Sequence, residues 1–274
     1  MKSKDGEWWN YSWNVAPGCT KVSDECAHCW ALTMAKRLQG MKKPGYEGLV
    51  DAKGNWTGKV NLMNWRLEDP LKLKTPHVIA VNLMGDLFHP QIPDAFIGQV
   101  FGIMGKANQH TYMVLTKRPD RMLEVITRIN RVFGALPNIW LGTTAGTQRS
   151  ANERWSSMAL IAQWGWNTWV SSEPRLEAIH WRGWAFLKML VTGGESGPYA
   201  RPMVPAWPRA DRKWCEDHGV DFWFKQWGEW GPTPPVNGEE SQLAVATFGD
   251  ERMYRVGRKL AGRRLDGAIC GVEL

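Results

Sequence analysis

The sequence predicts an α/β protein, most simply a single (β/α) barrel of about six to seven strands. Seven short apolar runs recur along the 274 residues, and most of them precede a stretch with helical periodicity. Near-continuous apolar runs are typical of parallel strands that are covered on both faces. The length suits one such barrel, because a complete barrel uses about 250 residues.

The predicted strands are short and rich in β-branched or aromatic residues. They cover residues 11–15, 77–84, 111–115, 138–141, 168–170, 188–191 and 221–224. Each run ends abruptly in polar residues or glycine, and in a barrel of parallel strands these endings meet at one rim. We therefore expect a site at that rim, although such residues also serve simply as turns.

Helices are predicted between the strands from apolar residues at helical spacing. The first covers residues 31–39 and ends at Gly40. Pro93 and Pro119 each begin another helix, at the position where proline is favoured. A further helix is predicted over residues 207–219.

Two regions lie outside this alternation, within a predicted single domain of residues 1–274. Residues 41–76 are predicted as an insertion, and residues 231–274 as an extension that starts with a mobile loop over 231–249. Within the extension, residues 252–264 carry six Lys or Arg and no acid. This basic run is a candidate phosphate contact, and a solvated surface is the alternative.

Charge and composition exclude several classes of protein. The 34 Lys and Arg against 27 Asp and Glu give a net charge of +7, which permits contact with a polyanion without requiring it. No apolar run approaches the roughly 18 residues of a membrane span, and no apolar signal core begins the sequence. We expect a cytoplasmic protein that contacts no membrane.

Tryptophan is unusually abundant, with 18 residues against 8 Phe and 5 Tyr. Four tryptophans lie near the strand endings and are predicted to wall the site or stack a base, namely Trp13, Trp30, Trp140 and Trp227. Four others lie away from the endings and are predicted to pack the scaffold, namely Trp164, Trp166, Trp181 and Trp184.

Cys19, Cys26 and Cys29 have the spacing C-x6-C-x2-C and lie between the first predicted strand and the first helix. Three thiolates can hold zinc or an iron–sulfur cluster, and the spacing alone leaves the metal open. Structural zinc needs a fourth ligand, and His28 is a poor candidate because adjacent residues seldom both turn onto one ion. A cubane held by three cysteines leaves one iron free for a non-protein ligand.

The cysteine segment and several later motifs resemble a bacteriophage and bacterial three-cysteine family of radical-SAM-like proteins. The resembling segments cover most of the chain and are residues 13–23, 26–37, 56–60, 84–89, 115–119, 140–142, 172–174, 193–197, 224–228, 255–257 and 265–267. Such relatives usually carry Tyr where this chain has Trp30 and often Ser where it has Gly85. Neither difference removes a cluster ligand.

The resemblance implies a partial radical-SAM-type barrel with a [4Fe–4S] cluster on Cys19, Cys26 and Cys29. S-Adenosylmethionine would chelate the fourth iron through its amino and carboxylate groups, and an external electron donor would reduce the cluster. The first gap is three residues longer than in the commonest radical-SAM spacing, C-x3-C-x2-C. His28 lies where an aromatic residue often shields the cluster, so we expect it to be a packing or hydrogen-bonding neighbour.

The chemistry of the cofactor assigns candidate roles at the rim. Asp86 would accept a hydrogen bond from the ammonium group, and Lys117 or Arg118, which follow Thr116, would pair with the carboxylate. Thr116 and the polar or glycine residues after the later strands complete the candidate cofactor site, namely Thr143, Thr144, Ser172, Glu173, Gly193 and Gly194. The candidate catalytic residues at the same mouth are Glu195, Lys225 and Gln226.

The resulting hypothesis is an enzyme of isomerase or transferase type that generates a 5′-deoxyadenosyl radical to modify a carbon centre. The favoured substrate is a DNA base or nucleotide, as in a phage-type pyrimidine hypermodification or rearrangement. One alternative is a radical-SAM enzyme that acts on a small molecule or peptide. The other is a non-enzymatic, zinc-stabilised protein that binds nucleic acid.

Overall fold

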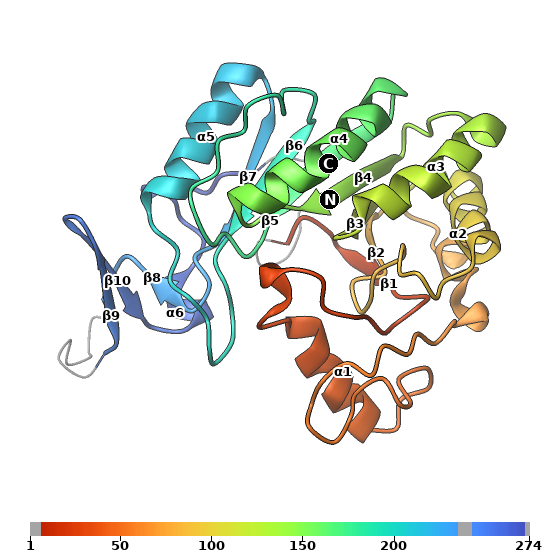
Figure 1. Cartoon of the computed structure of the whole chain (residues 1–274), viewed down its shortest axis with the longest axis horizontal. Coiled ribbons are helices and arrows are strands. Elements are labelled where there is room, and N and C mark those ends of the chain that lie inside the picture. Colours follow the sequence, from red (N-terminus) through yellow and green to blue (C-terminus); the bar gives the residue numbers. More distant parts are fainter. Residues whose placement is uncertain (1–6, 235–242, 272–274) are drawn as a thin grey trace.

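Seven parallel strands form one curled sheet, a half-barrel, and each strand pairs with the next one along the chain (Figure 1). The structure, a computed structural model, describes residues 7–234 and 243–271. The strands are β1 (Tyr11–Trp13), β2 (Val78–Val81), β3 (Thr111–Thr116), β4 (Ile139–Thr144), β5 (Asn167–Ser172), β6 (Met189–Gly193) and β7 (Asp221–Gln226). The predicted partial barrel of six to seven strands is confirmed.

One face of the sheet is covered by four helices (Figure 1). They are α2 (Asp94–Lys106), α3 (Pro119–Phe133), α4 (Gln148–Gln163) and α5 (Ala206–His218), while α1 (Trp30–Gly40) lies apart from them. Helix α4 has no counterpart among the predicted helices. Its buried face includes serines and Arg154 beside its few apolar residues, so it lacks the apolar stripe by which such helices are recognised.

The strand residues alternate between two apolar cores. Outward-facing residues pack against the helices, and among them are Ile79, Val114, Leu141, Val170 and Leu190. Inward-facing residues form a second core rich in tryptophan, with Trp8, Trp9, Trp140, Trp169 and Trp223. The Trp8 ring contacts the rings of Trp9 and Trp169, with centroids 4.4 and 4.7 Å away. The segment around Trp8 therefore lies within the half-barrel.

The tryptophans divide differently from the prediction. Trp166, Trp181 and Trp184 are buried in the outer core, as predicted for the scaffold. Trp13 is buried in that same core and donates from Nε1 to the Arg66 carbonyl at 2.7 Å, so its predicted place at the rim is wrong. The alternation of side chains along β1 turns Trp13 towards the helices.

The C-terminal extension forms a second, antiparallel sheet with the order β8 (Trp230–Gly231), β10 (Glu251–Arg255) and β9 (Val245–Phe248), followed by α6 (Arg258–Ala261). The predicted mobile loop over 231–249 is therefore wrong at both of its ends, and residues 235–242 lie outside the described residues. A small core that includes Phe224, Trp227 and Met253 joins this sheet to β7. Trp227 thus packs the extension instead of walling the rim.

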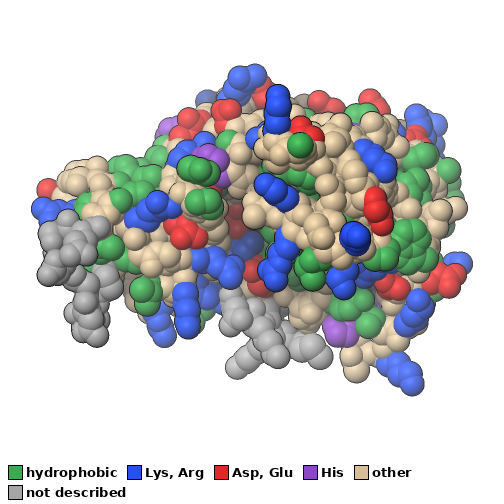
Figure 2. Space-filling view, turned by 90° about the horizontal axis from the view of Figure 1, so that it is seen from below, with side chains coloured by type: hydrophobic (Ala, Val, Ile, Leu, Met, Phe, Trp, Pro, Cys, Tyr) green, Lys and Arg blue, Asp and Glu red, His purple; other side chains and the backbone are tan. Residues whose placement is uncertain are grey.

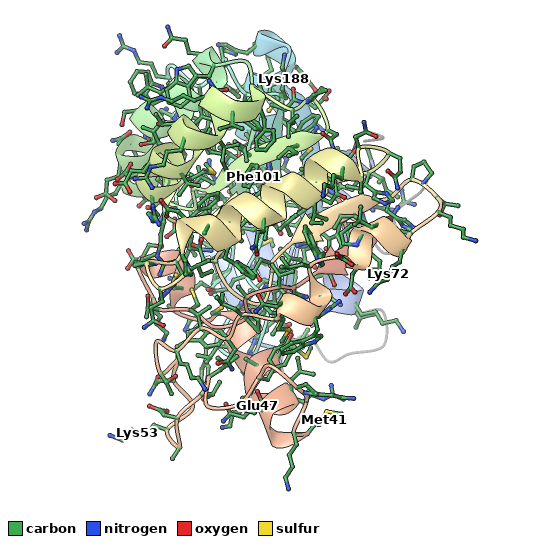
Figure 3. All side chains as sticks on the ribbon, turned by 90° about the vertical axis from the view of Figure 1, so that its right-hand side faces the viewer. Met41, Glu47, Lys53, Lys72, Phe101 and Lys188 are labelled. Atoms are coloured by element: carbon green, nitrogen blue, oxygen red, sulfur yellow. The ribbon has the colours of Figure 1, made fainter. Side chains whose placement is uncertain are left out.

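The insertion over residues 41–76 contains only two short 3₁₀ turns, η3 (Asn64–Arg66) and η4 (Asp69–Lys72). Tyr46 and Leu49 of this insertion pack against α1. In Figure 3 its labelled residues Met41, Glu47 and Lys53 lie at the opposite end of the molecule from Lys188, which directly precedes β6, whereas its labelled residue Lys72 lies between these two ends. The first part of the insertion therefore lies far from the end at which β6 begins, while its last part leads into the start of β2.

Among the helices of the described part of the chain, none is long and apolar enough to cross a membrane.

Candidate functional site

The cysteine segment, residues 19–29, begins where β1 and β2 end. Gly18 forms a parallel bridge with Gly85, which lies beyond β2. The φ angle of Gly18 is +111°, and a Cβ there would lie 2.2 Å from the Lys59 carbonyl oxygen, so only glycine fits. Cys26 closes the short turn η2 (Asp24–Cys26), and Cys29 is the N-cap residue of α1.

Arg118 joins the cysteine segment to the end of β3. Its Nη1 lies 2.7 Å from Asp86 Oδ2 and 3.8 Å from Cys19 Sγ. Its Nη2 donates to the carbonyl and the hydroxyl of Thr20, at 3.0 and 2.8 Å. The guanidinium is only 10% exposed, so this contact between a cation and a thiol is shielded from solvent.

Asp86 is engaged by donors of the chain itself. Thr116 Oγ1 donates to Asp86 Oδ1 at 2.7 Å, and the backbone N–H of Lys117 donates to Oδ2 at 3.2 Å. Asp86, Lys117 and Arg118 were predicted to hold the charged groups of the cofactor. In the structure the Lys117 backbone and the Arg118 side chain both bind Asp86. Their arrangement orients Arg118 towards Cys19, and their contact with a cofactor stays a prediction.

Burial raises the pKa of the Cys19 thiol to about 11, and Asp86 adds to this shift while Arg118 opposes it. The thiol is consequently protonated at neutral pH when no metal is bound. Metal binding at Cys19 would release this proton, because the thiolate is the form that ligates metals.

Glu25 is a residue of this site that sequence reasoning did not single out. It lies next to Cys26, and its side chain is fully buried. Its Oε1 accepts from the backbone N–H of Gly146 at 3.0 Å and from Arg154 Nη1 at 3.2 Å. Arg154 also donates to the Thr144 carbonyl at the end of β4.

Glu25 therefore attaches the cysteine segment to the end of β4 and to α4. Burial opposes its charge, but the attraction of Arg154, the nearby hydroxyls of Ser150 and Ser23 and the hydrogen bond from the Gly146 backbone lower its pKa to about 2. The available signal was the long first cysteine gap, which carries an acid directly before a predicted ligand.

Glu195, beyond β6, holds the other side of the cysteine segment. Its Oε2 lies 3.0 Å from His28 Nδ1, and Arg201 Nη2 donates to its Oε1 at 2.6 Å. Arg201 also donates to the Asp24 carbonyl at 3.3 Å. Burial opposes ionisation of Glu195, but hydrogen bonds from Arg201 and His28 lower its pKa. His28 thus bonds to Glu195, while its predicted place beside a cluster and the catalytic role of Glu195 stay predictions.

The polar residues at the ends of β4 and β5 have different surroundings. Thr143 donates to the Thr116 carbonyl at 2.9 Å, and the Ser172 hydroxyl lies 3.4 Å from Arg175 Nη1. The Thr144 hydroxyl is buried without a hydrogen-bond partner in the described part of the chain. Of the three, Thr144 is the one whose hydroxyl has no partner, and the contact of all three with a cofactor stays a prediction.

Gly194 is required by the packing of the chain itself, whereas Gly193 is only closely packed. A Cβ at Gly194 would lie 1.9 Å from the Trp227 carbonyl oxygen, and one at Gly193 would lie 3.2 Å from Glu173 Cγ, in a side chain that can shift. Gln226, on the neighbouring strand, donates to the Ser196 hydroxyl at 3.0 Å. The approach of the two glycines to a cofactor and the catalytic role of Gln226 stay predictions.

Lys225 reaches the tryptophan-rich interior, and its side chain is 16% exposed. Its Nζ lies 2.9 Å from Glu173 Oε2, 3.4 Å from Glu7 Oε2 and 5.0 Å from the centre of the Trp9 ring. Burial opposes the charge of Lys225, but Glu173 and Glu7 raise its pKa. Two predicted residues, Lys225 and Glu173, thus form one ion pair, which Glu7 joins from a segment that carried no prediction.

The donor set of the cysteine segment is three free thiols, of which Cys26 is buried and Cys19 and Cys29 are half-buried. Three thiolates suit a cubane cluster whose fourth iron takes another ligand. Across residues 7–234 and 243–271, no three His, Cys, Asp or Glu side chains gather closely enough to hold one metal ion.

Comparison with known proteins gives one family and a group of solved structures. No curated protein matches the chain. A cysteine-to-serine mutant of spore photoproduct lyase is 12% identical with a TM-score of 0.45, over 95% of this chain and 73% of that one. A spore photoproduct lyase mutant with bound AdoMet and dinucleoside spore photoproduct is 12% identical with a TM-score of 0.42, over 90% and 68%.

Residues 4–271 match the family described as "Protein of unknown function (DUF5131)". Because this match spans nearly the whole chain, the protein belongs to the DUF5131 family.

Proposed function

We propose that the protein is a radical-SAM enzyme that acts on a DNA base or nucleotide. It would hold a [4Fe–4S] cluster on Cys19, Cys26 and Cys29, with S-adenosylmethionine beside it. The observation that carries this proposal is the attachment of a three-thiol segment to the ends of β3, β4 and β6, through Arg118, Glu25 and Glu195. The resemblance of the sequence to the bacteriophage and bacterial three-cysteine family supports the same function.

The chain's own residues orient the thiols and exclude water. Arg118 places a cation 3.8 Å from Cys19 Sγ, which favours the thiolate that a metal requires. The inward-facing tryptophans make the interior apolar around the ion pairs of Lys225 with Glu173 and Glu7, which suits a reactive radical that must not meet water. Cys19, Cys26 and Cys29 would hold the cluster, which would supply one electron from an external donor for the cleavage of S-adenosylmethionine into methionine and a 5′-deoxyadenosyl radical able to take hydrogen from a substrate carbon.

Charge supports a nucleotide or nucleic-acid substrate. The net charge is +7, and several Lys and Arg side chains, together with a few acidic ones, lie around a hollow on the face that Figure 2 shows. An excess of positive charge around a recess attracts polyanions and speeds their association. A small molecule or peptide as substrate remains the alternative that the experiments below separate from this one.

Anaerobic reconstitution tests the radical-SAM function. We expect a brown protein with about four irons per chain, as a cubane requires, that converts S-adenosylmethionine to 5′-deoxyadenosine. Cys29→Ala should lose iron and activity together. Cys215→Ala, which alters a buried thiol of α5, should retain both and serves as the matched control. A colourless protein with one tightly bound zinc would instead establish the zinc-stabilised binding protein.

The salt dependence of DNA affinity tests the substrate class. Phosphate contacts release counterions, so log Kd should rise steeply with log salt concentration for a nucleic-acid substrate. A weak affinity that salt leaves unchanged would favour the small-molecule or peptide alternative. The ratio of 5′-deoxyadenosine to product then separates a transferase that consumes S-adenosylmethionine from an isomerase that recycles it.

A further inference from the structure

The inner face of the half-barrel becomes polar towards the ends of its strands. Trp169 of β5 and Trp223 of β7 belong to the tryptophan-rich inner core. Because side chains alternate along a strand, Glu173 and Lys225 continue on the same face beyond them, and their side chains meet at 2.9 Å. A Cβ at Gly193, on the strand between them, would lie 3.2 Å from Glu173 Oε2. The inner face therefore carries a polar pair next to its apolar core.

Glu7 adds a second carboxylate to this pair, and we call Glu7, Glu173 and Lys225 the Lys225 cluster. Glu7 Oε2 lies 3.4 Å from Lys225 Nζ. That oxygen is buried and has no aligned hydrogen bond from any of the described residues. An ammonium has three N–H donors, one more than two carboxylates engage with one bond each. The cluster thus keeps both an acceptor and a donor for another molecule.

Two further polar groups of the interior lack partners. Thr144 ends β4 opposite Ser171 of β5, and alternation places its side chain on the same face as Trp140. Its hydroxyl is fully buried without a hydrogen-bond partner, and so is Nε1 of Trp8, as far as the chain is described. Buried polar groups are nearly always hydrogen-bonded, to protein or to another molecule. The inner face is therefore incomplete without a ligand or water.

Half-buried tryptophan rings lie beside these polar groups. Trp9 and Trp140 are only partly buried against the inner core. Lys225 Nζ lies 5.0 Å from the centre of the Trp9 ring. Flat aromatic surface next to a few hydrogen-bonding groups is typical of sites that bind a planar heterocycle.

The charges of the Lys225 cluster disfavour an anion and favour an uncharged ligand. One ammonium already faces two carboxylates. Burial raises the pKa of Glu7 and the charge of Glu173 adds to this shift, so negative charge is in excess there. A ligand N–H would satisfy Glu7 Oε2, and a ligand carbonyl would accept from Lys225. A nucleobase with a ring N–H beside a carbonyl, its lactam edge, offers both groups.

We propose that Glu7 and Lys225 form a subsite that recognises the lactam edge of a nucleobase. Glu7 Oε2 accepts the ring N–H, Lys225 donates to the carbonyl, and Glu173 holds Lys225 in place. The inference rests on the proposed function and specifies which bases the site selects. Thymine, uracil and guanine carry this edge, whereas adenine and cytosine lack it. Enzymes that act on an extruded base commonly read it through its hydrogen-bonding edge.

Fluorescence anisotropy with two labelled strands tests the subsite on the anaerobically reconstituted protein. One strand is fluorescein-labelled dodecathymidylate, and the other carries N3-methylthymine at every position. Both strands have the same charge, but the second lacks the ring N–H. Wild type should bind the first about thirtyfold more tightly, as expected for a hydrogen bond to a buried carboxylate. In Glu7→Ala this preference should fall below about threefold, because the acceptor is gone.

Glu153→Ala is the matched control. Glu153 pairs with Arg149 at the surface of α4, and its loss should change the preference by less than about twofold. Thermal melts followed by circular dichroism verify that each variant is folded. Glu7→Gln keeps an uncharged acceptor and supplies a milder change if Glu7→Ala is not folded. Its preference should be about fivefold, because a neutral acceptor bonds more weakly.

Competition with thymidine identifies the source of the base. Displacement of the labelled dodecathymidylate assigns the subsite to a free nucleoside. No displacement, together with the preference between the two strands, assigns it to a base within a polynucleotide.

Equal affinity of wild type for the two strands would overturn the subsite. An unchanged preference in Glu7→Ala, or no binding of either strand by wild type, would overturn it as well. The formation of 5′-deoxyadenosine is measured on the wild-type preparation. A failure of the subsite with radical chemistry intact is therefore distinct from a failure of the proposed function.

Discussion

Two buried arginine–carboxylate pairs hold different regions of this molecule, and their surroundings differ. In the scaffold, Arg175 Nη2 lies 2.9 Å from Asp211 Oδ1, and both side chains are 1% exposed. At the cysteine segment, Arg154 Nη1 lies 3.2 Å from Glu25 Oε1, with 6% and 0% exposed. The first pair attaches α5 to the loop after β5, and the second attaches an irregular segment to α4.

The pKa values of the two carboxylates shift in opposite directions, although burial raises both. Burial raises the pKa of Asp211 although Arg175, Trp181 and Thr192 oppose the shift. Glu25 is also buried, yet its partners lower its pKa to about 2. The Arg175–Asp211 pair thus lies within regular structure that is packed around it. The Arg154–Glu25 pair instead attaches the cysteine segment, which has little regular structure of its own. The same chemistry serves stability in one region and the position of the thiols in the other.

Asp211→Ala should have the largest effect on stability. It leaves the Arg175 charge buried and unpaired, which costs about 4 kcal/mol of unfolding free energy. Urea unfolding followed by circular dichroism measures the loss, and the folded fraction should still take up iron. Asp217→Ala, on the same helix but paired with Lys213 at the surface, is the control and should cost under about 1 kcal/mol. Similar losses in both variants would remove the distinction between the pairs.

Glu25→Gln should affect stability somewhat less and iron binding much more. Loss of its charge leaves Arg154 without an ion partner, at a cost of about 3 kcal/mol. Because the segment is then less firmly fixed, iron per chain and the visible absorption of the reconstituted protein should both fall. Asp24→Asn alters the neighbouring acid, whose backbone carbonyl rather than side chain contacts Arg201, and should leave both unchanged. Full iron content in Glu25→Gln would show that the ion pair does not position the thiols.

The stability that Glu25 contributes should depend on pH in a defined window. Its pKa is about 2 in the folded protein and 4.5 in the unfolded chain, so folding favours the ionised form. The contribution is complete above pH 4.5 and is lost as the pH falls towards 2. The difference in unfolding free energy between wild type and Glu25→Gln should therefore shrink across this window. A difference that stays constant down to pH 2 would contradict the lowered pKa.

Trp181→Phe should have the smallest effect of the three substitutions. It removes the 2.7 Å hydrogen bond from Trp181 Nε1 to Asp211 and keeps most of the buried ring. We expect a loss of about 1–2 kcal/mol in unfolding free energy, with no change in iron content. Trp214→Phe, in the same region but only partly buried, is a suitable comparison. An effect as large as that of Asp211→Ala would mean that the hydrogen bond from Trp181, not the ion pair with Arg175, stabilises the buried Asp211 carboxylate.

The parts of the fold that could be predicted are those with local periodicity. All seven strands of the half-barrel fall at predicted runs, because parallel strands buried on both faces are apolar along their whole length. Helix α4 and the strands β8 and β9 could not be found in this way. Helix α4 buries serines and an arginine, β8 has only two residues, and β9 alternates exposed with half-exposed residues.

The contacts of the site show the same limit. The thiols and the polar residues after the strands could be identified because they occupy short, recognisable motifs. Glu25 and Arg154 are 129 positions apart, and Glu7 meets Lys225 from the opposite end of the chain, so only the folded structure brings them together. Arg118 and Asp86 were predicted as separate ligands of one cofactor, but the structure shows that they bind each other.

The tryptophans inside the half-barrel have an optical consequence. Trp8, Trp9 and Trp169 form a chain of ring contacts, with centroids 4.4 and 4.7 Å apart, so excitation absorbed by one indole passes readily to the next. An iron–sulfur cluster absorbs broadly across the wavelengths at which tryptophan emits. Binding of a cluster to the cysteine segment should therefore quench the intrinsic tryptophan fluorescence. Recovery of this fluorescence would report loss of the cluster in real time without a label.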